Sequence, residues 1–98
     1  MSEASCNELV RNVENQWGPG AKMSALTNVF ADVNNYFTTT QAKHLIELVS
    51  DEANRLQLAK ASYRNITDPA NFSQMYELLN TQSSKNDLSA YVSSYARY

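Results

Sequence analysis

TTTQAKHLIELVSDEANRLQLAKASYRNITDPANF, residues 38–72, is the stretch that decides the fold, because it holds three helix start signals and two apolar stripes. Thr38 and Gln41 have the spacing of a capping box. In this motif the threonine hydroxyl accepts from the third helical N–H and the glutamine reaches back to the cap. The apolar residues that follow recur at helical spacing: Ala42, Leu45, Ile46 and Val49. We therefore expect a short helix over residues 38–49.

A second helix is predicted from residue 51 to residue 66. Ser50 is a suitable N-cap, and Asp51 and Glu52 place negative charge in the first turn, where the helix dipole favours it. Its apolar stripe is Ala53, Leu56, Ala59, Tyr63 and Ile66. Asp68-Pro69 is a third start signal, since Asp caps helices and Pro is tolerated at the first helical position. Helices this short are marginal alone, so we expect them to be stabilised by packing on one another.

Further helices are expected on both sides of this stretch. Ser5 and Glu8 have capping-box spacing at the start of a first helix, and Ser84 and Asp87 have it at the start of a sixth. The second helix is predicted over residues 21–37, and the fifth follows Pro69. The apolar stripes of these four helices are Leu9, Val10, Val13 and Trp17; Met23, Leu26, Val29, Phe30, Val33, Tyr36 and Phe37; Phe72, Met75, Tyr76, Leu78 and Leu79; and Leu88, Tyr91, Val92, Tyr95 and Tyr98.

The second helix of each predicted pair has apolar residues spaced by three, four and three positions. These residues are Leu26, Val29, Val33 and Tyr36; Leu56, Ala59, Tyr63 and Ile66; and Leu88, Tyr91, Tyr95 and Tyr98. The three sets are separated by 30 and 32 positions, and a period of roughly 20–50 residues is typical of tandem helical hairpins. We therefore predict an all-α fold of six short helices, arranged as three tandem helical hairpins around one core. The alternative is six helices without internal symmetry.

Composition and charge narrow the class of protein. The 98 residues are enough for one small domain, 1–98, in which residues 1–20 form the first helix and its loop. The net charge of −2 and the absence of a basic stripe argue against nucleic-acid binding. No apolar run approaches the roughly 20 residues of a membrane span, so we expect no membrane insertion. Cys6 is the only cysteine and has no intrachain disulfide partner.

A family resemblance is carried by the middle of the chain. Leu56-Gln57-Leu58-Ala59-Lys60, Tyr63, Asp68 and Asn71-Phe72, together with Gln41, Ser83-Ser84-Lys85, Leu88 and Tyr91, resemble the signature of the bacterial domain of unknown function 4476 family. The region that resembles it is residues 21–98. The resemblance implies a helical domain, often near the end of extracytoplasmic proteins, and supplies no activity, cofactor or catalytic residue. No signal peptide opens this chain, so a cytoplasmic location is the alternative expectation.

Few residues are suited to catalysis or metal binding. His44 and Glu47 share a helix face, but a helical metal site would need more carboxylates and a second histidine. Cys6 would need a base such as His44 beside it, and we expect it in a frayed terminus. Glu52 with Arg55, and Arg64 with Asp68, are expected to be surface pairs or caps. We expect no enzyme activity, no cofactor and no metal.

Two sets of residues are candidates for an interaction surface. Tyr63, Arg64, Asp68 and Asn71 cluster where one helix ends and the next begins, and they form either a recognition corner or a purely structural one. The structural interpretation is favoured, with Tyr63 buried and the three polar residues capping helix ends. The second set, Tyr91, Tyr95 and Tyr98, shares one face of the last helix, and tyrosine suits a half-buried interface.

The function expected from these patterns is that of a non-enzymatic helical interaction or scaffold domain. We expect a protein partner, and self-association through the last helix is a further hypothesis. The alternative is a domain that binds a small ligand in a pocket between hairpins, which would require convergent polar groups in an apolar cavity.

Overall fold

The structure is a computed structural model that describes residues 1–32 and 34–95. Its helices are α1 (Glu3–Glu14), α2 (Gly18–Ala31), α3 (Thr39–Ile46), α4 (Glu52–Ser62) and α5 (Gln82–Tyr95), with the 3₁₀ helices η1 (Tyr63–Asn65) and η2 (Pro69–Leu78). Between the described residues, the one β-type pairing is an isolated bridge. The predicted all-α fold of six helical segments is therefore confirmed, with η2 as the fifth.

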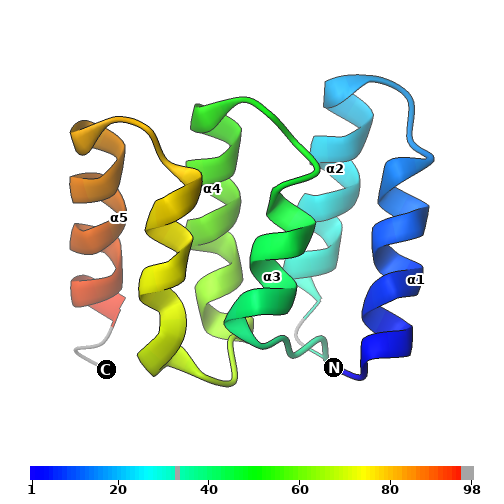
Figure 1. The fold of residues 1–98 in the computed structure, drawn as a ribbon, viewed down its shortest axis with the longest axis horizontal. Helices are drawn as coiled ribbons and strands as arrows, with labels where there is room; N and C mark the ends of the chain where they lie inside the picture. The colour runs from blue at the N-terminus through cyan, green and yellow to red at the C-terminus, as the bar shows by residue number, and fades with distance from the viewer. Residues whose placement is uncertain (33, 96–98) are drawn as a thin grey trace.

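The helices stand side by side in two rows, with molecular extents of 34 × 26 × 19 Å (Figure 1). In one row α1 contacts α3 and α3 contacts η2; in the other, α2 contacts α4 and α4 contacts α5. The consecutive helices α1 and α2 also pack together, as do α3 and α4. The starts of α3 and η2 are 30 positions apart, and so are those of α4 and α5. That the three pairs are copies of one repeated unit stays a prediction.

One apolar cluster joins the helices. Phe30, Leu45, Leu58 and Leu88 come from α2, α3, α4 and α5, and all four are almost completely buried. The other buried members are Val13, Leu26, Phe37, Ala42, Ile46, Val49, Ala59, Phe72, Met75, Leu78 and Leu79. Since burying one such side chain contributes about 1.5–3 kcal/mol, helices too short to persist alone can be held by this shared core.

The start of α3 is as predicted. The Gln41 N–H donates to the Thr38 hydroxyl at 3.2 Å, and the Thr38 N–H donates to the Gln41 side chain at 3.1 Å. Both halves of the capping box are therefore formed. The Gln41 amide also donates to the Met1 carbonyl at 2.8 Å, which ties the beginning of the chain to this helix.

Three of the other four predicted N-caps were wrong; the fourth, Asp68, holds the N-cap position of η2 as predicted, although its side chain makes no cap hydrogen bond there. Ser2, not Ser5, caps α1, because the Ser2 hydroxyl accepts from the Ser5 N–H. Asp51, not Ser50, caps α4, and the Thr81 hydroxyl accepts from the Ser84 N–H at the start of α5. In α1 and α5 the predicted cap residue lies inside the helix, three positions after the real one. In each case another Ser, Thr or Asp close by in the sequence caps the helix, so the helix begins at a different residue from the one predicted.

The helices predicted over residues 21–37, 38–49 and 51–66 end earlier than predicted, at Ala31, Ile46 and Ser62. The second helix stops at Ala31, because Asp32 leaves the helical conformation and its carboxylate accepts from the Asn34 N–H at 2.9 Å. Phe37 lies outside the helix but is fully buried, and it forms a parallel bridge with Ile66 after the end of α4. The Phe37 N–H donates to Asn65 and its carbonyl accepts from Thr67, both at 2.8 Å. The bridge places the links before α3 and η2 side by side.

Four apolar residues expected on helix stripes are instead exposed, among them Ala53 in α4 and Tyr95 in α5. Trp17 is 93% exposed at the turn between α1 and α2, and Tyr36 is 56% exposed in the link before α3. Val33, also assigned to the second helix, lies outside the described residues. Cys6 shows the opposite departure: it was expected in a frayed end, but it is 5% exposed and lies within α1.

Candidate functional site

The predicted recognition corner at residues 63–71 is divided between separate structural contacts. Arg64 turns toward the end of α2, where its guanidinium donates to the Phe30 and Ala31 carbonyls at 3.4 Å. These carbonyls belong to the last turn of α2, where a cation is favoured by the helix dipole. Arg64 therefore caps a neighbouring helix and is not paired with Asp68.

Asp68 holds the start of α3. One carboxylate oxygen accepts from the Thr39 N–H at 2.7 Å and from the Thr39 hydroxyl at 3.0 Å, and the other accepts from the Asn71 amide at 3.0 Å. The Asn71 hydrogen bond, followed by those from Thr39, holds the pKa of Asp68 below its usual value against the opposing effect of burial. Asp68 and Asn71 therefore contribute to the fold, and their side chains are occupied by it.

Tyr63 contacts aromatic side chains of η2 and of the last helix. Its ring meets Phe72 edge-on at 4.8 Å between centroids and Tyr95 edge-on at 5.2 Å. Tyr91 lies next to Tyr95, with centroids 6.2 Å apart. Edge-to-face geometry is preferred by aromatic pairs at these distances. The structure thus brings one residue of the predicted corner together with two of the predicted helix face.

We call Tyr63, Tyr91 and Tyr95 the tyrosine surface. Phe72 is buried beneath it, Tyr63 and Tyr91 are half-buried, and Tyr95 is 40% exposed. Tyr98, the third tyrosine predicted on this face, lies outside the described residues.

Lys60 borders the tyrosine surface and was not predicted as part of it. Its ammonium lies 6.0 Å from the Tyr91 ring centroid and pairs with the Asp87 carboxylate at 3.1 Å. The sequence could have indicated this position, because Lys60 comes one helical turn before Tyr63 and so lies on the same face of the helix.

Glu52 is a structural residue that the sequence did not reveal. It was expected to pair with Arg55, but its carboxylate accepts from the Asn80 and Thr81 N–H groups and from the Thr81 hydroxyl at 2.6 Å. Led by the Thr81 hydroxyl, hydrogen bonds lower the pKa of Glu52 to about 2. Arg55 instead donates to the Val49 carbonyl at 2.7 Å.

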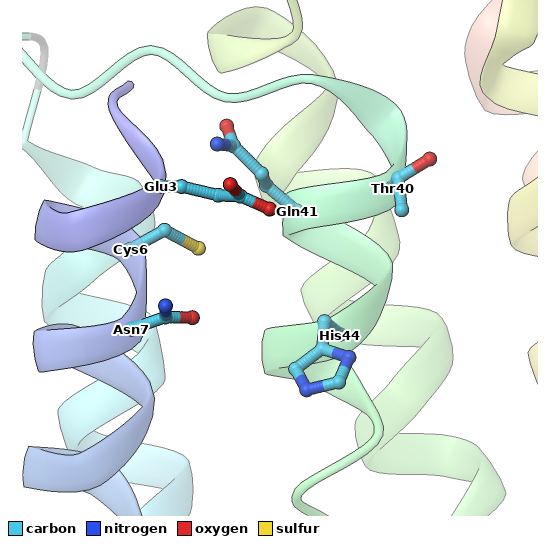
Figure 2. A pocket seen from close by; sticks show the side chains of 6 residues that line it. All are labelled: Glu3, Cys6, Asn7, Thr40, Gln41 and His44. Carbon is cyan, nitrogen blue, oxygen red and sulfur yellow. The ribbon is translucent and has the colours of Figure 1, made fainter.

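A pocket of about 170 Å³ lies between α1 and α3 (Figure 2). Its lining residues are Glu3, Cys6, Asn7, Thr40, Gln41 and His44. Figure 2 shows the Cys6 thiol pointing from α1 toward the α3 side, which carries His44. Burial raises the pKa of the Cys6 thiol, with Glu3 adding to the effect and the chain's ammonium group opposing it. The thiol is therefore protonated at neutral pH, unlike an activated nucleophile.

Within residues 1–32 and 34–95, no three His, Cys, Asp or Glu side chains are grouped as a metal site would require. Over the same residues, no helix has the length and apolar character to cross a membrane.

These features define a small helical domain with a half-buried aromatic surface. A family profile described as "Domain of unknown function (DUF4476)" matches residues 1–92, and the chain belongs to this family. The match includes the first helix and covers the resembling region 21–98 as far as residue 92. No curated protein sequence and no solved structure matches the chain.

Proposed function

We propose that this protein is a non-enzymatic helical interaction module and that a partner protein docks on the tyrosine surface. The observation that carries the proposal is the meeting of Tyr63 and Tyr95, which are 32 positions apart and come from different helical segments. Tyrosine is enriched at the centres of protein interfaces because it offers a large apolar ring with a polar tip. Here the Tyr63 ring packs against the buried Phe72, and Tyr63, Tyr91 and Tyr95 each remain partly exposed.

The outward side of α5 is a poor alternative surface. Its exposed residues Ser89, Ala90, Ser93 and Ser94 are small and mostly polar. A polar outer face at the end of a row of helices keeps further copies from stacking there. Self-association, if it occurs, is therefore expected through the tyrosine surface.

A photo-cross-linking experiment tests the docking surface. The full chain carries benzoylphenylalanine at position 95 or, as a matched control on the other side of α5, at position 89. Both proteins are irradiated in an extract of the source organism. The captured protein is then purified, and its affinity is measured against Tyr95→Ser and Ser89→Ala variants whose circular dichroism matches that of the parent.

We expect specific adducts from position 95, and a partner whose Kd is weakened about tenfold by Tyr95→Ser but less than twofold by Ser89→Ala. An adduct with a second copy of this chain would identify self-association through the same surface. Equal capture from both positions, or an affinity that Tyr95→Ser leaves unchanged, would overturn the proposal.

A second candidate function, binding of a small ligand, is favoured by the pocket between α1 and α3. It lies between two helix pairs, as that hypothesis requires, and combines a thiol, an imidazole and amide groups. Its volume of about 170 Å³ is below the roughly 300–1,000 Å³ of typical ligand sites. A ligand there would be only a few atoms in size. Protection of Cys6 from a thiol reagent by such a ligand, lost in His44→Ala, would support this function over the first.

A further inference from the structure

The helix η2 is unusually long for a 3₁₀ helix. It keeps this geometry over 10 residues, Pro69–Leu78, whereas η1 has 3. Runs of more than about three or four residues are uncommon, because the hydrogen bonds of a 3₁₀ helix have poorer geometry than those of an α-helix. In η2 the Asn71 N–H donates to the Asp68 carbonyl at 2.9 Å, and the Leu79 N–H donates to the Tyr76 carbonyl at 3.1 Å. Contacts outside the segment are therefore needed to hold it in this form.

The sequence of η2 also fits an α-helix. Its buried residues fall at every third position, Phe72, Met75 and Leu78, as a helix with about 3.0 residues per turn requires. In an α-helix, with about 3.6 residues per turn, Leu78 would lie roughly 120° away from Phe72 around the axis, and Leu79 would take its place. Leu79 is apolar and is buried directly after η2. The segment can therefore present an apolar face in either form.

Hydrogen bonds to other helices fix both ends of η2. Before it, the Asp68 carboxylate accepts from the Thr39 N–H at the start of α3, at 2.7 Å. After it, the Glu52 carboxylate at the start of α4 accepts from the Asn80 and Thr81 N–H groups, at 2.9 and 3.2 Å. A segment of this length spans about 20 Å as a 3₁₀ helix but about 15 Å as an α-helix. With both ends fixed, an α-helix would fall short of one partner by about 5 Å.

We propose that η2 is a two-state element, which the Asp68 and Glu52 carboxylates hold in its 3₁₀ form and which shortens to an α-helix when its C-terminal end is released. The N-terminal end is reinforced by the backbone bridge between Phe37 and Ile66, so release is expected at the Glu52 end. Shortening would draw the start of α5 toward η2, together with the two tyrosines of the tyrosine surface that α5 carries. This consequence for docking rests on the proposed function, whereas the conversion of η2 does not.

Three variants of the full chain test the conversion. Glu52→Ala removes the hydrogen bonds that hold the C-terminal end. An insertion of Gly-Ser between Leu79 and Asn80 keeps Glu52 and its partners but supplies about 6–7 Å of extra chain, which is more than the shortening requires. The matched control carries the same insertion between Gln16 and Trp17, in the exposed turn before α2. The dispersion of the amide NMR signals shows whether each variant is folded.

Nuclear Overhauser effects along residues 69–78 distinguish the two forms. Contacts from Hα of one residue to the amide proton two positions later are typical of a 3₁₀ helix, and contacts to the amide proton four positions later are typical of an α-helix. We expect the first set in the parent and in the control. In Glu52→Ala and in the insertion before Asn80, the first set should be lost and the second should appear.

The insertion before Asn80 decides the test if Glu52→Ala does not fold, because it leaves every side chain of the parent in place. An α-helical pattern in the parent or in the control would overturn the proposal, since η2 would then adopt that form with both ends held. A 3₁₀ pattern that persists in the insertion before Asn80, or in folded Glu52→Ala, would overturn it as well.

Discussion

At the residue scale, two carboxylates form hydrogen bonds that link segments far apart in the sequence. Asp68 accepts from the first N–H of α3, 29 positions away, and Glu52 accepts from N–H groups just before α5, 28 and 29 positions away. In both cases the carboxylate satisfies backbone donors near a helix start that have no partner within the helix. Each carboxylate therefore stabilises the start of a helix and also holds two segments against each other.

Replacing Asp68 by Ala should lower the free energy of unfolding by about 1–2 kcal/mol, the range for losing a helix N-cap. The Thr39 N–H would lose its partner in a half-buried place. Urea unfolding monitored by circular dichroism measures the change. Asp87→Ala, which removes only the surface pair with Lys60, is the control and should cost less than about 0.5 kcal/mol. Equal effects of the two substitutions would contradict the role of Asp68.

Because Glu52 and Asp68 form these hydrogen bonds as carboxylates, we expect the protein to lose stability in acid. The pKa of Glu52 falls from 4.5 to about 2 in the folded protein, and that of Asp68 also falls below its usual 3.8. Because the unfolded chain then binds more protons than the folded one, the stabilisation is complete above about pH 5 and is lost as the pH falls toward 2. Thermal unfolding between pH 7 and pH 2 should show this decline. A Glu52→Gln variant should decline less, and an unchanged profile would contradict the assignment.

At the scale of the element, the turn between α1 and α2 depends on one glycine. Gly18 has a φ of +78°, a conformation that costs other residues roughly 1–2 kcal/mol. Gly20 lies two positions further on in the first turn of α2, and neither glycine has another atom close to where a Cβ would be. The two positions therefore differ in backbone conformation and not in available space.

Gly18→Ala should destabilise the protein by about 1 kcal/mol, whereas Gly20→Ala should be neutral or stabilise it by up to about 1 kcal/mol, since alanine favours the helix. Differential scanning calorimetry on the two variants gives the comparison directly. The same sign for both substitutions would show that the turn does not require the left-handed conformation.

The sequence predicted which segments are helical but not where they end. Apolar periodicity extended the second helix to Phe37, because a buried residue in a link can continue a helical spacing by coincidence. Local signals could find the Thr38–Gln41 capping box, since both partners lie within one turn. They could not find the cap that Asp68 supplies to α3, because its partner is 29 positions away.

The same limit applies to the candidate site. Helical spacing correctly grouped Tyr91 with Tyr95 on one face, as their adjacent rings show. The contact of Tyr63 with Tyr95 depends on how α5 packs against α4, so no local pattern could have joined the two predicted surfaces. Tertiary packing also separated Arg64 from Asp68, which are neighbours in sequence but serve different helices.

For the whole molecule, stability rests on one cluster that receives side chains from every α-helix and from η2. Short helices cannot persist without this cluster. A substitution that removes packing at one end of the molecule should therefore destabilise the helices at the other end. Leu88 is the fully buried contribution of α5, and Phe30 is a fully buried contribution of α2. The two helices lie on opposite sides of α4 and each packs against it.

The direct measurement is native-state hydrogen exchange of the parent and of Leu88→Ala. A buried Leu→Ala substitution should cost about 2–5 kcal/mol. If the helices share one cooperative core, the slowest amides of α2 and of α5 should lose the same opening free energy, equal to the loss in global stability. A loss of protection confined to α5, with the amides around Phe30 in α2 fully protected, would contradict a single cooperative core.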